Sequence, residues 1–318
     1  MARIAITDGL SKSAVELLID AGHEVDLEPE KLDGFDAVVI RSATKLTKDV
    51  IESAPSLRLI GRAGVGVDNI DISAATTAGI LVCNTPSAST QSVVELTIGH
   101  LLASIRYIPT ADRDLRNGEW TKKKLRGSEL FGKRIGFIGF GRIAQGVARV
   151  AKIFGMELHA YDPYLPSEVA LELDCTLHED VNEIFKSCTH VAVHCNLTKE
   201  THHLVNSHTL SLMPGIGADG IKCGNHLVSC ARGGIVNEDD ALLALEDGTL
   251  SSCALDVFEN EPQTQHPILN HHNFHGTPHI GAATHEAQHR IGVEMAHLLI
   301  TYFDGNTPKS VVNRDVLS

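Results

Sequence analysis

The chain has 318 residues, of which 43% are hydrophobic, and a formal net charge of -13 at pH 7. This length exceeds what one ordinary core needs and is enough for two domains. The negative charge argues against nucleic acid or an anionic membrane as a partner, because the overall field would repel phosphate groups. An anionic substrate would therefore need a local cationic pocket.

The seven cysteines are scattered and include no CxxC pair. The N-terminus, Met1-Ala-Arg-Ile-Ala-Ile6, enters a strand pattern directly, without the pattern of a signal peptide. We therefore expect a cytoplasmic protein in a reducing compartment. No apolar run approaches the roughly 20 residues of a transmembrane helix, so we expect no membrane contact.

Short apolar runs alternate with helix-like segments in the first part of the chain. The predicted strands are Arg3–Thr7, Ala37–Ile40, Arg58–Ile60 and Ile80–Val82, and the predicted helices include Ser11–Asp20 and Thr47–Ser53. This βα alternation predicts a parallel sheet. A long amphipathic pattern follows from Ser89 to about Arg116, and then a lysine-rich polar stretch, Asn117–Ser128, which we expect to be exposed.

The βα rhythm restarts at Arg134, where an apolar strand runs into a glycine turn and a helix start. Gly139 permits a tight turn, Gly141 lets the backbone approach a pyrophosphate, and Ala144 allows the helix to pack closely on the strand. The free N–H groups at the helix start would face the anion. This pattern predicts a dinucleotide site.

An acidic residue in register with the turn strengthens this prediction. Asp162 follows the next apolar run, Glu157–Tyr161, at about the 20-residue spacing expected of an acid that bonds the ribose hydroxyls. A carboxylate there would repel a 2′-phosphate, so we expect NAD rather than NADP. The alternative is an ordinary strand–helix turn with a solvated Asp162.

The rest of the chain completes this second lobe. Further strands are predicted at Thr189–Val193, His226–Ser229 and Ser252–Asp256, with helices between them. The closing amphipathic segment, Thr284–Phe303, has no strand after it in that lobe, so we infer that it returns to the first lobe. We expect an α/β protein with two Rossmann-like, doubly wound parallel-sheet domains, one flavodoxin-like and one dinucleotide-binding, and a cleft between them. The expected domains are a discontinuous substrate-binding domain of residues 1–98 and 288–318, and an NAD-binding domain of residues 99–287.

Three polar segments stand at the expected carboxyl ends of second-lobe strands or in the loops after them, where an open α/β sheet binds its ligands. They are Ser229-Cys-Ala-Arg232, Leu255-Asp256-Val-Phe-Glu-Asn-Glu261 and Thr277-Pro-His279. Oxidation of a secondary alcohol needs a group that takes the hydroxyl proton, and histidine titrates near neutral pH, so His279 is our candidate. Glu261 would hold the imidazole in one tautomer, and Arg232 offers a planar fork for a carboxylate.

Each of these residues also has a structural interpretation. Arg232 is compatible with a surface turn, Glu261 with a helix-terminating loop, and His279 with an inert member of the eighteen histidines. Their joint position after strands of a dinucleotide fold favours the catalytic interpretation.

Together these motifs resemble the D-isomer-specific 2-hydroxyacid dehydrogenase family over nearly the whole chain. The matching text is Arg41-Ser-Ala-Thr-Lys, Gly61-Arg62-Ala-Gly-Val-Gly-Val-Asp68-Asn69, Asn84-Thr-Pro, Gly139-Phe-Gly-Arg-Ile, Tyr161-Asp162-Pro, Cys230-Ala-Arg-Gly-Gly-Ile-Val, Ala254-Leu-Asp-Val-Phe and Pro278-His-Ile-Gly-Ala. The resemblance implies an NAD-dependent enzyme in which Arg232, Glu261 and His279 are catalytic. It also implies that Asp256 bonds the nicotinamide carboxamide, and it adds these cofactor contacts: Arg142, Ile143, Val65, Cys195, Cys230, Ala231, Gly281 and Ala282.

Within this family, the sequence is most similar to members that oxidise D-3-phosphoglycerate to 3-phosphohydroxypyruvate in serine biosynthesis. Such a substrate carries a carboxylate at one end and a phosphate at the other, so its site needs positive charge at both ends. This gives the arginines of the first lobe a possible function. The implied substrate contacts are Arg41, Ser42, Arg62, Gly64, Val65 and Gly66, together with Arg232 and His279. The alternative is that Arg41 and Arg62 only cap strand ends or pair with surface acids.

Two other functions remain open from the sequence. One is a glyoxylate or hydroxypyruvate reductase, or another D-2-hydroxyacid dehydrogenase whose substrate has no phosphate. The other is an NAD-sensing binding protein, since this fold also serves as a transcriptional corepressor. The resemblance further implies a homodimer assembled through the nucleotide-binding lobes, with the region 117–130 reaching toward the partner.

Several features depart from the family pattern. Ser89 stands where an asparagine is common, Asn196 stands where a proline is common, and the glycine-rich segment 212–224 is longer than its counterpart, which favours a mobile surface loop. His271, His275 and His279 have metal-like spacing, but Pro278 breaks any helix that would align them, so we expect no metal site. Because the sequence ends at Ser318, we expect no inhibition by serine through C-terminal regulatory domains.

Overall fold

The computed structural model describes residues 1–317, and the chain divides into two compact units. The first unit contains Met1–Thr90 and the residues from Ala282 on, and the second contains Gln91–Gly281. The boundaries expected from the sequence, 98/99 and 287/288, fall inside helices α4 (Thr90–Ile105) and α11 (His285–Phe303). The observed boundaries lie near the first residues of these two helices, because a continuous helix packs as one body.

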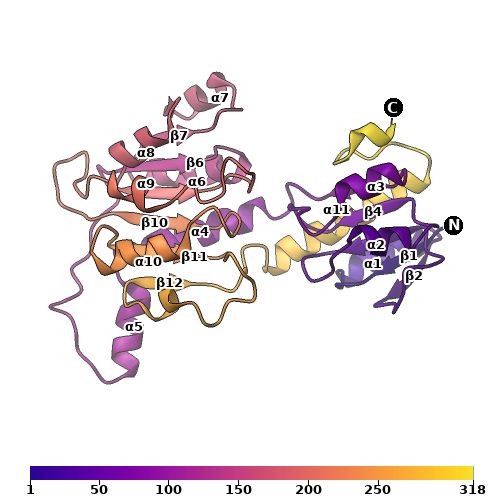
Figure 1. Cartoon of the computed structure of the whole chain (residues 1–318), viewed down its shortest axis with the longest axis horizontal. Coiled ribbons are helices and arrows are strands. Elements are labelled where there is room, and N and C mark those ends of the chain that lie inside the picture. Colours follow the sequence, from indigo (N-terminus) through magenta and orange to yellow (C-terminus); the bar gives the residue numbers. More distant parts are fainter. Residues whose placement is uncertain (318) are drawn as a thin grey trace. The chain divides into compact units, whose positions relative to one another are not determined.

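The first unit is built on a five-stranded, all-parallel sheet with the strand order β2-β1-β3-β4-β5. Its strands are β1 (Arg3–Ile6), β2 (Glu24–Leu27), β3 (Ala37–Ile40), β4 (Leu59–Arg62) and β5 (Leu81–Asn84). Its helices are α1 (Lys12–Asp20), α2 (Lys48–Glu52), α3 (Ile72–Thr77) and α11, and a 3₁₀ helix covers Arg314–Leu317. Figure 1 shows α11, near the C-terminus, lying beside the N-terminal elements, and α11 packs against α1.

Helices cover both faces of this sheet, so its central strand β3 is apolar throughout. All four residues of β3 are buried. Ile4 and Val39 belong to the core that contains residues of α1 and α11. Ala5 and Val38 belong to the core that contains residues of α2 and α3. The first unit is therefore a three-layer, doubly wound α/β structure.

The second unit has a seven-stranded parallel sheet with the order β12-β11-β10-β9-β6-β7-β8. Its strands are β6 (Arg134–Ile138), β7 (Glu157–Tyr161), β8 (Cys175–His178), β9 (His190–Val193), β10 (His226–Ser229), β11 (Ser252–Leu255) and β12 (Phe274–Gly276). Its helices are α4, α5 (Ile108–Arg116), α6 (Arg142–Ile153), α7 (Ser167–Glu172), α8 (Val181–Ser187), α9 (Ser207–Ser211) and α10 (Glu238–Glu246), and a 3₁₀ helix covers Pro267–Asn270. The α/β class with two doubly wound parallel sheets is confirmed.

The strand order of the second unit reverses between β6 and β9. From β6 the chain moves outward through β7 and β8, and then crosses to β9 on the other side of β6. One face is covered by α4 and α6, which share a core with β6. The other face is covered by α8, α9 and α10. Ligands of open α/β sheets bind at the carboxyl ends of the strands beside such a reversal.

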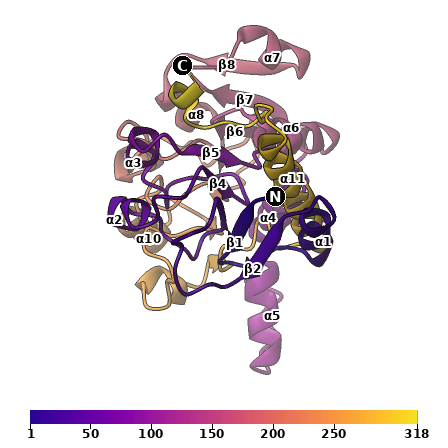
Figure 2. The same ribbon diagram turned by 90° about the vertical axis from the view of Figure 1, so that its right-hand side faces the viewer.

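The single amphipathic segment expected from Ser89 to Arg116 is two helices, α4 and α5, separated at Tyr107, which has φ +53°. Pro109 has no N–H to donate to the Ile105 carbonyl, so the α4 ladder cannot continue. Ser128 N–H donates to that carbonyl instead, at 3.1 Å. Figures 1 and 2 show α5 projecting from the second unit.

The glycine-rich segment 212–224 contains a hydrogen-bonded hairpin rather than an unstructured loop. Gly217 N–H donates to the Ile221 carbonyl at 2.9 Å. The nearly buried ammonium of Lys133 bonds the Asp219 carboxylate at 2.5 Å, which ties the hairpin to the start of β6. The role of this segment in function stays open.

Across residues 1–317, no helix combines the length and the apolar character needed to span a bilayer. In the same part of the chain, no group of three or more His, Cys, Asp or Glu side chains is arranged to hold a metal ion.

Candidate active site

The dinucleotide turn lies at the reversal point of the second sheet, between the carboxyl ends of β6 and β9. Gly139 has φ +83°, a conformation that L side chains rarely adopt. A Cβ on Gly139 would also lie 2.7 Å from the backbone nitrogen of Cys195. Glycine is thus required here both for the turn and for the close approach of β6 and β9.

Neither an unusual backbone conformation nor a close approach of the chain requires a glycine at Gly141. It is the N-cap of α6 with φ -72°, and a Cβ at this position would meet no atom of the chain within 4 Å. A side chain there would only fill the space in front of the first turn of α6. That twelve-residue helix begins at Arg142, so the backbone N–H groups of its first turn point toward this space. A pyrophosphate fits this cradle.

Asp162 follows β7 and is held by backbone groups on both sides. Its Oδ2 accepts from Phe140 N–H at 2.9 Å, and its Oδ1 accepts from Tyr164 N–H at 3.0 Å. A carboxylate has about four acceptor positions, so these bonds orient Asp162 toward the turn and leave capacity for ribose hydroxyls. Ala144, the third small residue of the motif, is fully buried against β6.

His279 and Glu261 lie at the carboxyl edge of the same sheet, on the other side of the reversal point from Asp162. Glu261 follows β11, and His279 follows β12. His279 Nδ1 and Glu261 Oε2 lie 2.7 Å apart, and their side chains are 42% and 36% exposed. Burial alone would raise the pKa of Glu261, but hydrogen bonds from His279 and from Phe258 N–H outweigh it and lower that pKa. Glu261 is therefore an ionised acceptor at neutral pH, and His279 carries its proton on Nδ1.

Arg232 is the third member of the group expected to be catalytic. It follows β10, and its positive charge contributes to the lowered pKa of Glu261. Gly233 explains how this loop approaches the loop after β11, because a Cβ on Gly233 would collide with the Phe258 carbonyl. The structure thus brings Arg232, Glu261 and His279 together from three segments of the second unit.

Asp256 is a buried residue that bonds the loop after β12. It is 1% exposed, and its carboxylate accepts from Thr277 Oγ1 at 2.6 Å, Ile280 N–H at 2.8 Å and Gly281 N–H at 2.9 Å. These bonds hold the loop that carries His279. The contact with a nicotinamide carboxamide stays a prediction.

The expected substrate residues of the first unit gather at the carboxyl edge of its own sheet. Arg41 directly follows β3, and Arg62 ends the neighbouring strand β4, paired in register with Ile40. The loop after Arg41 is fixed from both sides. Asp8 Oδ2 accepts from Arg41 N–H at 2.7 Å, and Asn69 Nδ2 donates to the Arg41 carbonyl at 2.6 Å.

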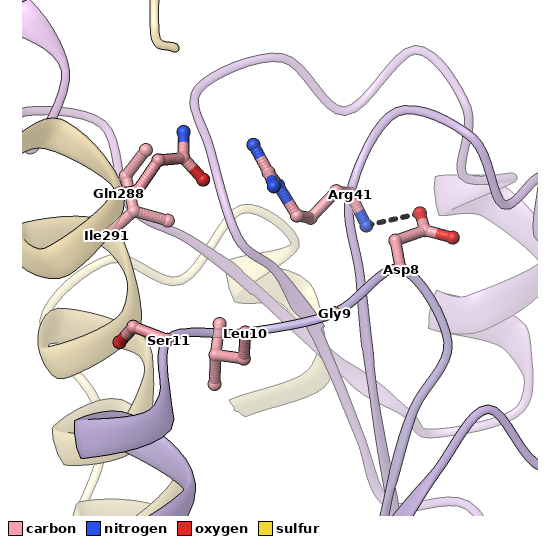
Figure 3. A pocket seen from close by; sticks show the side chains of 7 residues that line it. All are labelled: Asp8, Gly9, Leu10, Ser11, Arg41, Gln288 and Ile291. Carbon is pink, nitrogen blue, oxygen red and sulfur yellow. Dashed lines mark hydrogen bonds between the residues drawn. The ribbon is translucent and has the colours of Figure 1, made fainter. Parts of the chain in front are cut away.

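The Arg41 side chain reaches a pocket in the first unit. Figure 3 shows Arg41 and Gln288 of α11 facing this pocket, whose volume is about 310 Å³. A second pocket of about 560 Å³ is lined by Arg41 and by the first residues of α11 with their cap, Thr284. A guanidinium and the N-terminal end of a nineteen-residue helix both favour an anion. Glu286, which lines the second pocket, is the acidic group that an anion would have to avoid.

The loop after β4 folds tightly against its own arginine. Gly64 has φ +150°, and a Cβ there would collide with the Arg62 guanidinium. Asn84 Nδ2 donates to the Val65 carbonyl at 2.6 Å, and Thr85 N–H donates to the Gly64 carbonyl at 2.9 Å. This loop is thus held in one conformation with the guanidinium above it.

The remaining expected residues fall into two groups. Those at the carboxyl edge of the second sheet are Cys195 after β9, Cys230 and Ala231 after β10, and Gly281 after β12. Those in the first unit are Ser42, Val65, Gly66 and Ala282. Sequence reasoning gave no role to His100, Ser92 or Thr277, although all three bond the His279 loop or its neighbours. His100 stands out in the sequence only as a polar residue within the apolar run of α4.

These features define a class: a dinucleotide-binding protein of two doubly wound α/β units, with an Arg-Glu-His group at the cofactor edge. A family model described as D-isomer specific 2-hydroxyacid dehydrogenase, NAD binding domain, matches residues 98–281. The chain belongs to the D-isomer specific 2-hydroxyacid dehydrogenase family, and residues 98–281 are its NAD-binding domain.

Similar proteins include enzymes named for three different substrates. A D-3-phosphoglycerate dehydrogenase of Methanocaldococcus jannaschii is 44% identical over 98% of this chain and 60% of its own length. A hydroxypyruvate reductase of Thermotoga maritima is 40% identical over 92% of this chain and 95% of its own length. A crystal structure of D-lactate dehydrogenase from Aquifex aeolicus, complexed with NAD and lactic acid, is 26% identical with a TM-score of 0.84, covering 98% of this chain and 99% of that one. The chain spans about 60% of the length of the phosphoglycerate dehydrogenase.

Proposed function

We propose that this protein is an NAD-dependent D-2-hydroxyacid dehydrogenase that oxidises D-3-phosphoglycerate to 3-phosphohydroxypyruvate. The observation that carries the proposal is the 2.7 Å contact between His279 and Glu261, next to Arg232, in an NAD-binding domain. The similarity to D-3-phosphoglycerate dehydrogenase supports the substrate. In this group His279 would accept the proton, Glu261 would orient His279, and Arg232 would bind the substrate carboxylate.

His279 is the proton acceptor in this proposal. Glu261 accepts the Nδ1 proton, so Nε2 is the ring nitrogen left to take the proton of the substrate hydroxyl. As that proton arrives, the imidazole becomes a cation, and the neighbouring carboxylate stabilises the charge. In the reverse direction the same imidazolium returns the proton to the carbonyl oxygen.

Arg232 binds the substrate carboxylate through the two parallel N–H groups of its guanidinium. Its positive charge also polarises the oxygen on the neighbouring carbon as that oxygen changes from hydroxyl to carbonyl. Bound NAD supplies the acceptor for the hydride that leaves this carbon. The residues proposed to hold NAD are the Gly139–Gly141 turn, the first turn of α6, and Asp162.

Arg41 and Arg62 are the proposed partners of the substrate phosphate. Support comes from the pockets that Arg41 shares with the N-terminal end of α11. Ser42 and the Gly64–Gly66 loop, with their N–H groups, complete the proposed substrate contacts.

Hydroxypyruvate reduction is the second candidate. One observation favours it: the similarity to the Thermotoga maritima hydroxypyruvate reductase, which is 40% identical over 92% of this chain. The two functions share the chemistry of Arg232, Glu261 and His279. They differ in whether the substrate carries a phosphate.

A substrate panel separates these candidates. The measurement is kcat/KM with NAD for D-3-phosphoglycerate, D-glycerate and D-lactate, by NADH absorbance. We expect the highest value for D-3-phosphoglycerate, and Arg41→Ala should lower that value by roughly 10- to 100-fold through KM, since a charge-assisted hydrogen bond contributes about 1.5–3 kcal/mol. Arg58→Ala removes an arginine that packs on Tyr302 and serves as the matched control.

The panel can also contradict the proposal. Equal values for D-3-phosphoglycerate and D-glycerate, unchanged in Arg41→Ala, would support the reductase instead. NAD binding without turnover of any hydroxy acid would support a binding protein.

We also propose a homodimer assembled through the NAD-binding units. Several large apolar side chains of the second unit are exposed, among them Trp120 at 82%, Phe131 at 72% and Ile153 at 83%. Exposed apolar surface of this kind is typical of an interface. Light scattering should give twice the chain mass of 34.2 kDa, and a mass of one chain at micromolar concentration would contradict the dimer.

A further inference from the structure

The loop that carries His279 is wrapped around Asp256 of the second unit. The Asp256 carboxylate accepts hydrogen bonds from Thr277 Oγ1, Ile280 N–H and Gly281 N–H. The Asp256 carbonyl accepts from His279 N–H at 2.8 Å. Four bonds to one buried residue therefore fix the path of the loop from Thr277 to Gly281.

This loop needs such restraint because of its backbone conformation. His279 has φ +52°, in the left-handed region that residues other than glycine rarely adopt. Such a conformation costs on the order of 1 kcal/mol or more, and it persists only where surrounding contacts enforce it. The side chain that results is 42% exposed, so packing alone does not hold it.

A buried histidine of α4 supports the loop from behind. His100 is 4% exposed, and its Nε2 lies 3.1 Å from Thr277 Oγ1. The Thr277 hydroxyl donates its only proton to Asp256, at 2.6 Å, so it accepts from His100. His100 therefore carries its proton on Nε2. The result is a directed chain of bonds from His100 through Thr277 to Asp256.

Two further contacts attach α4 to the same region. Ser92 Oγ donates to the Gly281 carbonyl at 2.5 Å, at the other end of the loop. The His275 ring lies beside the His100 ring, with centroids 5.2 Å apart and planes tilted by 40°. His275 Nε2 is buried and has no hydrogen-bond partner in the described part of the chain, so His275 serves as a packing partner that limits rotation of the His100 ring.

We propose that His100 is a positioning residue for the proposed dehydrogenase reaction. It acts through Thr277 and Asp256 and holds the loop that presents His279 to Glu261. This inference rests on the proposed function for its kinetic consequence, but the structural coupling can be measured without turnover. His100 does not contact the reacting atoms. Its effect is to fix the orientation of the proton acceptor, and small displacements of such a group can cost about 100-fold in rate.

Hydrogen exchange of the peptide 277–281 tests the coupling directly. In His100→Leu and in Thr277→Val we expect the amides of this peptide to exchange roughly 5- to 30-fold faster, because the first variant removes one supporting hydrogen bond of the loop and the second removes two. His100→Gln, which restores a donor, should return exchange toward the wild-type rate. If His100→Leu does not fold, Thr277→Val and Thr277→Ser provide the same comparison, because only Thr277→Ser keeps the hydroxyl.

The matched control is His226→Leu. His226 is also buried and bonds a hydroxyl, Ser252 Oγ at 2.7 Å, but it lies at the amino end of β10. This variant should lose stability without a selective change at 277–281. Equal exchange of that peptide in wild type and His100→Leu, or an equal increase in both His100→Leu and His226→Leu, would overturn the proposal.

Kinetics provide the second readout. With a substrate that wild type turns over, His100→Leu should lower kcat by roughly 10- to 100-fold while the KM for NAD changes little. In a His279→Ala background the same substitution should cause no further loss, because the two residues act in series. A full additional loss in that background would contradict the proposal. Absence of wild-type turnover would contradict the proposed function alone, and the exchange result would still decide the role of His100.

Discussion

The contact between His279 and Glu261 indicates a role for each residue: His279 as the proposed proton acceptor and Glu261 as the group that orients it. The carboxylate accepts the Nδ1 proton at 2.7 Å, which leaves Nε2 as the only ring nitrogen for the substrate. The positive charge of Arg232 acts on the same carboxylate and helps to keep it ionised. The proposed proton transfer and the proposed binding of the substrate carboxylate therefore depend on one small electrostatic group.

We propose that the charge of Asp162 favours NAD over NADP. Asp162→Ala removes the negative charge that would repel a 2′-phosphate, and like charges placed together cost several kcal/mol. We therefore expect the ratio of kcat/KM for NAD to that for NADP to fall by roughly 10-fold or more. Steady-state kinetics with both cofactors provide the measurement.

Asp162→Asn provides the control for this prediction. The amide oxygen can still accept from Phe140 N–H or Tyr164 N–H, so this variant separates the charge from the turn geometry. Asp162→Asn should also relax the preference for NAD. A preference unchanged in both variants would mean that other residues exclude NADP.

The central residues of the site could be predicted because chemistry restricts their type and the sheet restricts their place. Gly139 and Arg232 follow strands that are recognisable as apolar runs, and parallel strands bring their carboxyl ends to one edge. His279 could be predicted from its chemistry and its motif, although β12 before it is too short to be recognised. His100 could not be predicted in this way. Its partner, Thr277, is 177 residues away along the chain, and a single histidine in an apolar helix has no distinctive pattern.

At the scale of elements, the sequence predicts buried strands better than exposed or very short ones. β3 is a continuous apolar run and has the predicted bounds. β2 at the sheet edge, Glu-Val-Asp-Leu, has no fully buried residue, and β12 has only three residues, so neither stands out as a strand. Both are formed by pairing with a neighbour rather than by their own apolar content.

The division of one predicted helix into α4 and α5 has a local cause that the amphipathic pattern conceals. Pro109 removes the donor for the Ile105 carbonyl, and Ser128 replaces it from a distant part of the chain. Gly127 permits this approach, because a Cβ there would collide with the same carbonyl. A hydrophobic period alone therefore cannot locate the end of α4.

At the scale of the whole molecule, buried histidines make stability depend on pH. Burial lowers the pKa of His159, His194, His226 and His275 to about 4, and it lowers that of His190 as well. All five lie in the second unit. Below pH 6.5 the unfolded chain binds protons that the folded chain does not, so stability is complete above pH 6.5 and is lost as pH falls toward 4.

We therefore expect the free energy of unfolding of the second unit to decrease below pH 6.5. Each such histidine contributes about 1.4 kcal/mol per pH unit in that window. Denaturant unfolding at pH 7.5 and pH 5 measures the effect, and His226→Gln should reduce the difference between the two values. Equal stability at pH 5 and pH 7.5 would contradict burial of these rings.

The proposed role of His279 can be tested by the rate of NADH formation from D-3-phosphoglycerate in wild type, His279→Ala and Glu261→Gln, with NADH binding followed by fluorescence. We expect turnover by wild type, a loss of about 100-fold or more in His279→Ala, a loss in the same direction in Glu261→Gln, and retained NADH binding in all three. Turnover by His279→Ala near the wild-type rate would contradict this role.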